Sequence, residues 1–347
     1  MKQVVFIVAL MVCLFFPAHP LWAEPMDESY RFPDLYNPNP LGGRIWLQPL
    51  GIHDDRVTDH AEICLNFGSS TDYNVNFIET PGDKELTVNT NIYTLSLARS
   101  MDMVGRRVEM GGIFRSHQDM RSTLGSSLVK RYHEAFPSDG FGHVPPEGQY
   151  YGAVGDNETA VIGESREFYL NTLQLYAKYQ LCRETTGFMD SALKLSIRVP
   201  LSGKSFDKRG IALSAGFSKQ MGPHLRAIGS GGLVFQDLDA KDFDANNLDV
   251  ASWVYDVFAG LVWDMGRPGG WYAQAGMRYA SKRVSYIQNS DSAAAAVVTH
   301  FGPVYRFREK QGRVIEWFMS FNEDIPGLGY GLEPDVAFYT GVSVLFR

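Results

Sequence analysis

One stretch at the end of the chain, residues 334–347 (PDVAFYTGVSVLFR), decides the fold. Apolar and polar side chains alternate along it with the period of two that a β-strand with two different faces requires. A soluble edge strand with this apolar row would tend to aggregate, whereas the closing strand of an outer-membrane β-barrel turns such a row towards lipid. The row comprises Val336, Phe338, Val342, Val344 and Phe346 and is broken only by Thr340, while the other face carries Asp335, Tyr339, Gly341, Ser343 and Arg347, with Ala337 and Leu345 as exceptions.

Similar segments precede this stretch, so we expect an all-β fold. The specific expectation is a twelve-stranded antiparallel transmembrane β-barrel with a short extracellular helical insertion. A bend at residues 68–70 could divide the first segment into a hairpin and give thirteen strands, but single-chain bacterial barrels have even numbers. The expected strands are 61–79, 86–98, 106–116, 167–181, 189–200, 209–219, 224–236, 250–264, 271–282, 294–307, 311–323 and 335–346.

The connections between these segments alternate in length. Short periplasmic turns that alternate with longer extracellular loops are typical of outer-membrane barrels, and a soluble β-sandwich has no reason to sort its loops in this way. The alternation therefore places the N-terminal segment and the C-terminus in the periplasm. The short connections are 99–105, 182–188, 220–223, 265–270 and 309–310, and the mostly longer ones are 117–166, 201–208, 237–249, 283–293 and 324–334.

The two faces of the strands differ as a membrane barrel requires. In 250–264, Trp253 and Trp263 share one face near the two strand ends, while Asp256 lies on the other face. Charged residues at membrane depth must pair or contact water. They fit either a salt-bridged, largely closed lumen that only stabilises the barrel, or a narrow polar channel whose charges select solutes. The lumen-lining candidates are Arg107, Glu109, Arg115, Lys178, Lys194, Arg198, Asp256, Arg278, His300 and Glu316.

The insertion 117–166 contains the one segment with helical periodicity. Apolar side chains recur every four residues until Pro137 ends the pattern, which predicts an amphipathic helix at about 120–135. This helix could pack on loops at the extracellular rim or fold into the lumen as a lid. The gate or lid candidates are Leu124, Leu128, Tyr132 and Phe136.

The N-terminal residues predict export. Residues 1–23 combine a positive start, an apolar run and a cleavage site before Glu24, as in a secretory signal peptide. The alternative is an uncleaved anchor helix, but the run is shorter than the ~20 residues that such a helix needs. Residues 24–58 are rich in proline, and we expect a periplasmic segment or a plug in the barrel mouth. The barrel then covers residues 59–347.

Composition and spacing argue against several other classes of protein. The formal net charge of −7 does not fit a strongly basic nucleic-acid-binding protein. Cys64 and Cys182 could pair in an oxidising periplasm, but the expected strands place them apart. The aspartates of 237–249 lack the spacing of a calcium-binding loop, so we expect no metal and no cofactor. A hydrolase would need a serine beside a histidine, and neither Ser214 nor any other serine is evidently paired with His300, so we expect no catalytic site.

Short motifs are spread over most of the mature chain. They are Asn39-Pro40-Leu41, Tyr132-His133-Glu134-Ala135-Phe136-Pro137, Leu195 with Pro200-Leu201-Ser202-Gly203, Asn322-Glu323-Asp324-Ile325 and Pro334-Asp335-Val336-Ala337-Phe338. In these motifs the chain resembles the Gram-negative outer-membrane family known as domain of unknown function 3187. The resemblance implies a transmembrane barrel and brings no catalytic residues.

These patterns predict a narrow channel or transporter for small solutes, with a non-conducting structural or surface-interaction barrel as the alternative. A passage lined by Arg107, Lys194, Arg198 and Arg278 would favour anions. The expected partners are outer-membrane lipid and lipopolysaccharide, and the barrel-assembly machinery through the C-terminal strand. Neither the solute nor the oligomeric state follows from the sequence.

Overall fold

The computed structural model describes most of the chain that was expected to form strands. No helix among the described residues is long and apolar enough to cross a membrane. The expected helix at 120–135, with Leu124, Leu128, Tyr132 and Phe136, lies outside the described residues, as does the signal segment 1–23. The described residues are 47, 55–57, 61–74, 86–103, 106–119, 151–153, 159–161, 169–184, 188–201, 209–237, 248–265, 271–281, 284–286, 296–308, 313–324 and 336–346.

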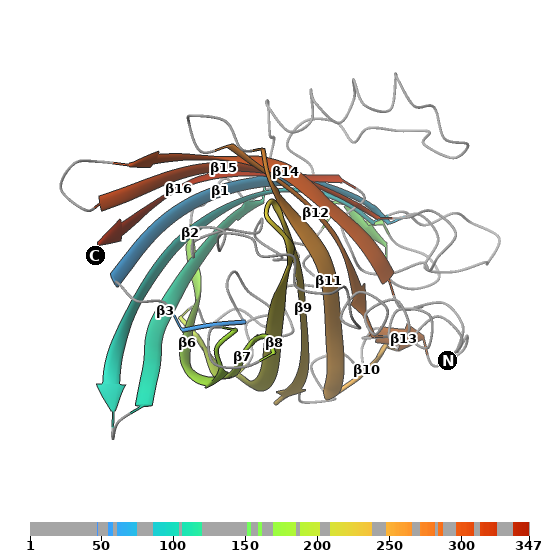
Figure 1. Ribbon diagram of the computed structural model, residues 1–347. Coiled ribbons are helices and arrows are strands. Elements are labelled where there is room, and N and C mark those ends of the chain that lie inside the picture. The colour runs from blue at the N-terminus through green and yellow to red at the C-terminus, as the bar shows by residue number, and fades with distance from the viewer. Residues whose placement is uncertain are drawn as a thin grey trace.

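Twelve long strands form one closed antiparallel barrel (Figure 1). The barrel closes because the first strand pairs with the last one on one side and with the second on the other. In the order around the barrel, the strands are β1 (Ala61–Asn74), β16 (Val336–Phe346), β15 (Arg313–Asp324), β14 (Ala296–Arg308), β12 (Trp271–Ala280), β11 (Trp253–Asp264), β9 (Leu225–Gln236), β8 (Gly210–Gly222), β7 (Asp190–Pro200), β6 (Tyr169–Cys182), β3 (Arg106–Asp119) and β2 (Leu86–Met103).

Four short strands lie within the longer connections. β4 (Tyr151–Ala153) adjoins β2 at the end of the barrel and pairs with β5 (Thr159–Val161). β10 (Leu248–Val250) and β13 (Val284–Tyr286) form a separate two-stranded ribbon. These short strands lie at one end of the barrel and are not part of its twelve-stranded wall.

The expected strands are confirmed, with small shifts at their ends. β1 continues through Ser69 and Ser70 as one strand, so the hairpin alternative is wrong and the count is twelve. β2 extends to Met103, so its turn to β3 is much shorter than the expected 99–105. The ladder of hydrogen bonds between β2 and β3 continues past Arg99, because nothing in that stretch prevents further pairing.

The two ends of the barrel differ in their connections. We call the end with the short connections the turn end: it holds the turn at residues 223–224 between β8 and β9, the start of β1 and the end of β16. The opposite loop end holds the longer connections. The general rule for outer-membrane barrels puts the turn end in the periplasm. Figure 1 shows the C-terminus beside the start of β1 at this end.

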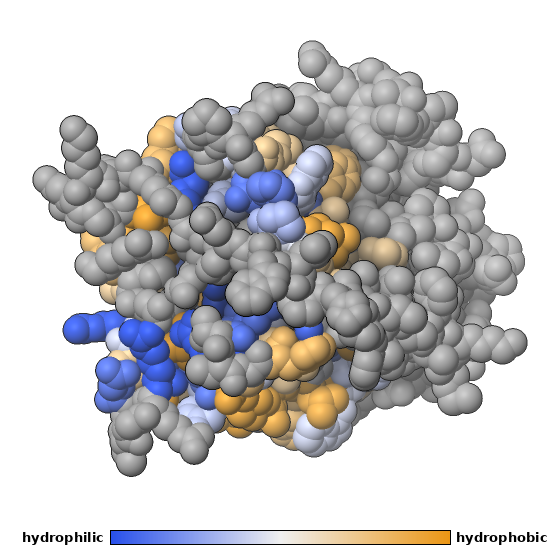
Figure 2. All heavy atoms as spheres, in the orientation of Figure 1, coloured by the Kyte–Doolittle hydropathy of each residue, from blue (hydrophilic) through white to orange (hydrophobic). Residues whose placement is uncertain are grey.

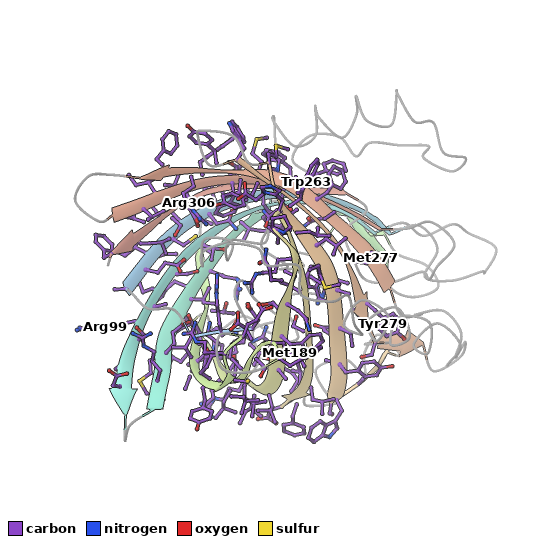
Figure 3. The ribbon with its side chains drawn as sticks, viewed as in Figure 1. Arg99, Met189, Trp263, Met277, Tyr279 and Arg306 are labelled. Atoms are coloured by element: carbon purple, nitrogen blue, oxygen red, sulfur yellow. The ribbon has the colours of Figure 1, made fainter. Side chains whose placement is uncertain are left out.

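The outer face of the barrel is apolar and the inner face is mostly polar. In β16, Val342 is 43% exposed, whereas its neighbour Ser343 is fully buried. Trp263 and Met277 lie on the exposed face, while Arg306 lies on the buried one (Figure 3). Figure 2 shows apolar residues gathered on the outside of the strands. An apolar outer surface on a closed sheet, in which the strands satisfy each other's backbone groups, is the arrangement that a bilayer requires.

Candidate functional site: the polar lumen

The lumen collects most of the charged residues that the sequence pattern placed there. Because successive side chains of a strand point to opposite faces, the apolar outer row forces the alternate residues inward. Arg107 is different: it lies at the turn end, its side chain is 40% exposed, and it lies 3.9 Å from the exposed Asp102. His300 is placed only by its backbone in β14. The remaining candidates are inward and buried: Glu109, Arg115, Lys178, Lys194, Arg198, Asp256, Arg278 and Glu316.

The first buried ion pair joins β11 to β12. Arg278 Nη2 lies 2.7 Å from Asp256 Oδ2, and both side chains are at most 2% exposed. The direct cross-strand partner of Arg278 is Phe258, which is the next inward residue after Asp256 on β11. The ion pair is therefore diagonal across the two strands. This contact keeps both charged side chains along the wall and holds the carboxylate and the guanidinium together.

A second pair joins β14 to β15 and includes a residue that the sequence analysis missed. Arg306 is the cross-strand partner of Glu316, and Arg306 Nε donates to Glu316 Oε1 at 2.7 Å. Arg306 Nη1 also donates to Tyr272 Oη at 3.0 Å, and its guanidinium carbon lies 4.7 Å from the centre of that ring. Alternation along β14 could have found Arg306, because it shares its face with the buried Val304.

A third group lies on β3 and β6. Lys178 Nζ is 3.0 Å from Glu109 Oε1, and the same oxygen accepts a hydrogen bond from Tyr176 Oη at 3.0 Å. Tyr176 is the cross-strand partner of Gly111, and a Cβ at Gly111 would meet the Tyr176 ring at 2.3 Å. Glycine is therefore required there for the ring to lie flat against the wall.

Positive charge gathers on the wall formed by β3, β6 and β7. Arg115 Nη1 donates to Gln174 Oε1 at 2.9 Å, and Gln174 is in turn the cross-strand partner of Arg198. Lys178 and Lys194 are also direct cross-strand partners. We call Arg115, Lys178, Lys194 and Arg198 the basic wall. Like charges directly opposite each other destabilise a sheet, and here Glu109 offsets the charge of Lys178.

The opposite side of the lumen is partly apolar. Inward side chains of β9, β11, β12, β14 and β15 form one buried cluster that also includes Cys64 of β1. Such a layer narrows the space inside the barrel. The cluster consists of Cys64, Ile228, Phe258, Val262, Tyr272, Val304 and Phe318.

Residues from before the first strand also contact the inner wall. Asp55, Arg56 and Val57 are buried, and Ser218 Oγ of β8 donates to Asp55 Oδ2 at 2.7 Å. Leu47 is buried too, and its backbone N–H donates to Gln236 Oε1 at 3.0 Å. Ser218 lies towards the turn end and Gln236 at the loop end of the same pair of strands. These contacts place residue 47 and residues 55–57 against the inner wall, and the other residues of the segment 24–58 lie outside the described part of the chain.

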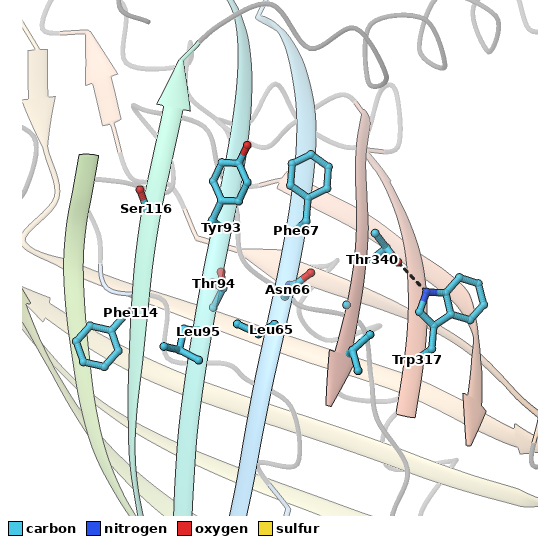
Figure 4. A pocket seen from close by; sticks show the side chains of 12 residues that line it. Leu65, Asn66, Phe67, Tyr93, Thr94, Leu95, Phe114, Ser116, Trp317 and Thr340 are labelled. Carbon is cyan, nitrogen blue, oxygen red and sulfur yellow. Dashed lines mark hydrogen bonds between the residues drawn. The ribbon is translucent and has the colours of Figure 1, made fainter. Parts of the chain in front are cut away.

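An apolar hollow of about 660 Å³ lies across β1, β2, β3, β15 and β16 (Figure 4). Phe67 and Tyr93 line it, with their ring centres 5.3 Å apart. Thr340, which interrupts the apolar row of β16, accepts a hydrogen bond from Trp317 Nε1 at 3.1 Å. The lining of the hollow combines side chains of the exposed outer face, such as Leu65 and Tyr93, with the buried Asn66, Thr94 and Ser116.

The remaining candidates for chemistry do not come together. Cys64 and Cys182 are free thiols on β1 and β6, which are not neighbours. Ser214 and His300 lie on β8 and β14, with three strands between them. Within the part of the chain that the structure describes, no three His, Cys, Asp or Glu side chains group around a possible metal position.

Comparisons with known proteins find similar structures but no related sequence. No protein-family model matches the chain, and the search of curated proteins finds no relative. An outer membrane channel from Pseudomonas putida F1 shares 12% identity with a TM-score of 0.48, covering 85% of this chain and 97% of that one. A FadL homologue of Pseudomonas aeruginosa shares 11% identity with a TM-score of 0.38, and the match covers 92% of this chain and 99% of that one. The toluene transporter TodX of Pseudomonas putida shares 10% identity with a TM-score of 0.40, and the match covers 90% of this chain and 98% of that one.

These likenesses are distant, so the assignment rests on the geometry of this chain. A closed barrel with an apolar outer face and charged residues inside is an outer-membrane barrel. Its family stays a prediction, because the resemblance to domain of unknown function 3187 has no matching model behind it.

Proposed function

We propose that this barrel is a narrow channel for small polar solutes and that its basic wall favours anions. The observation that supports this most is the set of buried charges in the lumen. Replacing buried ion pairs by well-packed apolar residues is often neutral or stabilising, so stability alone does not account for them. A passage that fills with water when it opens would account for them, because water solvates charges at membrane depth.

The basic wall supports the preference for anions. On β3, β6 and β7, the described buried inward residues include the four cations of that wall and only two carboxylates, Glu109 and Asp190. Arg278, Arg306 and, within the basic wall, Lys178 each lie within hydrogen-bonding distance of a carboxylate, which reduces their net field. Rings of basic side chains favour anions in pores. We therefore propose Lys194 and Arg198 as the selectivity residues, and not Arg107 at the rim or Arg278 in its ion pair.

A non-conducting barrel is the second candidate, and one observation favours it. The inward charged residues are buried in this conformation, and residues 55–57 also lie against the inner wall. Solute flux into proteoliposomes that contain the folded, purified protein separates the two functions. Entry of small anions faster than neutral solutes of the same size would support the channel, and no entry of any solute would support the non-conducting barrel.

Export and assembly complete the proposal. Cleavage of residues 1–23 and insertion by the barrel-assembly machinery through β16 would deliver the barrel to the outer membrane, where lipid and lipopolysaccharide surround it. The alternation of Val342 and Ser343 in β16 fits the last strand of such a barrel. We propose no enzymatic activity.

A further inference from the structure

Residues 55–57 make specific hydrogen bonds to the inner wall of the barrel. Val57 is bound through both of its backbone polar groups: its N–H donates to Gln180 Oε1 at 2.7 Å, and its C=O accepts from Arg183 Nη2 at 2.6 Å. One residue of the chain is thus held by two side chains of β6 and the turn that follows it. Figure 1 shows a short blue segment from this region beside β6 and β7.

Backbone groups of β6 and β7 orient the Gln180 side chain for its contact with Val57. Gln180 Nε2 donates to the backbone oxygens of Cys182 at 2.6 Å and Ser191 at 2.9 Å. These two bonds fix the orientation of the amide, so its oxygen must point towards Val57. The register of β6 and β7 shifts between Gln180 and Cys182, and such a bulge re-aims a side chain.

The hydroxyl group that binds Asp55 is oriented by its neighbours in the same way. Ser218 Oγ, which donates to Asp55, accepts a hydrogen bond from Arg226 Nη1 at 2.9 Å. Arg226 Nη1 is itself 3.0 Å from Asp190 Oδ2, and Arg226 Nη2 is 3.4 Å from Glu184 Oε2. Three elements of the turn end therefore orient the hydroxyl that binds Asp55. The sequence analysis missed Arg226, although it lies on the inward row of β9.

The third contact lies at the other end of the same strands. Gln236 Nε2 donates to the backbone oxygen of Arg209 at 2.5 Å, which turns its oxygen towards the N–H of Leu47. A Cβ at Gly210 would meet Gln236 Oε1 at 2.4 Å and Leu47 Cβ at 3.2 Å. Only glycine at this position leaves room for the side chain and for Leu47 together.

We propose that residues 55–57 are a latch that closes the turn end of the lumen and that release of this latch opens the passage. Two features support a releasable contact. The barrel is a single closed, hydrogen-bonded sheet that does not need these residues to close, because β1 pairs with β16 and β2. The latch is held by a few hydrogen bonds, each worth about 1 kcal/mol net, so its opening costs far less than unfolding of the barrel.

The test uses two latch variants of the full chain and two matched controls. Gln180→Met and Ser218→Ala each remove one latch contact and keep the approximate size of the side chain. Gln274→Met on β12 and Ser320→Ala on β15 are the controls, because both are buried inward residues that the described contacts place away from residues 55–57. The readouts are amide hydrogen exchange of the segment that contains residues 55–57, and single-channel openings in a planar bilayer.

In the variant that carries both Gln180→Met and Ser218→Ala, we expect about tenfold faster exchange at residues 55–57 and more frequent channel openings. We expect neither change in the controls. Unchanged exchange in the latch variants would overturn the latch. Faster exchange without a change in openings, in a barrel that conducts, would overturn its role in closure. Silence of every variant, with faster exchange in the latch variants, would overturn the proposed channel and, with it, closure by the latch. A heat-modifiability shift of each variant on gels checks that the barrel is folded.

Discussion

Arg278 and Asp256 form an ion pair of 2.7 Å between two adjacent strands, and neither side chain is more than 2% exposed. The pair connects the fold to the proposed function. Both residues lie at inward-facing positions, which alternate with outward-facing ones along each strand. A purely structural core would not need a charge on either partner. The lumen therefore contains polar groups at a depth where an unpaired charge is costly.

Breaking this pair is expected to destabilise the barrel. Asp256→Ala leaves the Arg278 guanidinium buried without its carboxylate, and we expect a loss of about 3 kcal/mol in the free energy of unfolding. The double variant Asp256→Leu with Arg278→Met is expected to recover most of that loss. Reversible urea unfolding from lipid vesicles, followed by tryptophan fluorescence, measures both. Equal stability of the wild type and the Asp256→Ala variant would contradict the account of this pair.

The strands and the direction of their faces follow from the sequence with few errors. Alternation suffices for this purpose, because a membrane barrel has one apolar solvent outside and polar groups inside, so each strand shows the same period. Thr340 was the one interruption in the row of β16, and its hydroxyl is bound by Trp317 on the next strand. Arg226 and Arg306 lie near the ends of their strands on the same buried rows, so the same alternation predicts their inward direction.

The contacts of the N-terminal residues could not be predicted in the same way. Asp55 and Ser218 are 163 positions apart in the chain, and Asp55 belongs to no periodic segment. Pairings between strands follow from their order along the chain, but the path of a proline-rich segment inside a barrel does not. The polar side chains that receive it are indistinguishable in the sequence from other inward residues, such as Gln274.

The contact between Gly111 and Tyr176 gives a second prediction on stability. Gly111→Ala places a methyl group into the Tyr176 ring, so the ring must leave the wall and give up its hydrogen bond to Glu109. We expect a loss of about 1–3 kcal/mol in the free energy of unfolding. Gly222→Ala is the matched control, because no atom lies within 4 Å of its added Cβ, and we expect almost no change. Similar effects of the two substitutions would show that the close approach is not required.

The apolar outer face predicts a dependence on membrane depth. Leu213 of β8 is 53% exposed on that face and is the cross-strand partner of Leu195, the middle residue of β7. Leu213→Arg is expected to cost about 2–4 kcal/mol of stability in a bilayer, because a guanidinium must enter hydrocarbon. Met101→Arg, near the turn end of β2, is expected to cost at most about 1 kcal/mol. Vesicle-based urea unfolding of the two variants measures the difference, and an equal cost at both positions would argue against the predicted bilayer span.

The most direct test of the central claim, that the charged inner wall lines a passage, is the reversal potential of single channels under a salt gradient. It is measured for the wild type, for Lys194→Glu with Arg198→Glu, and for the rim control Arg107→Glu. We expect an anion-selective wild type, a loss or inversion of selectivity by roughly severalfold in the double variant, and little change in the control, because salt screens exposed charges within about 10 Å. Openings whose selectivity is the same in all three proteins would contradict the claim.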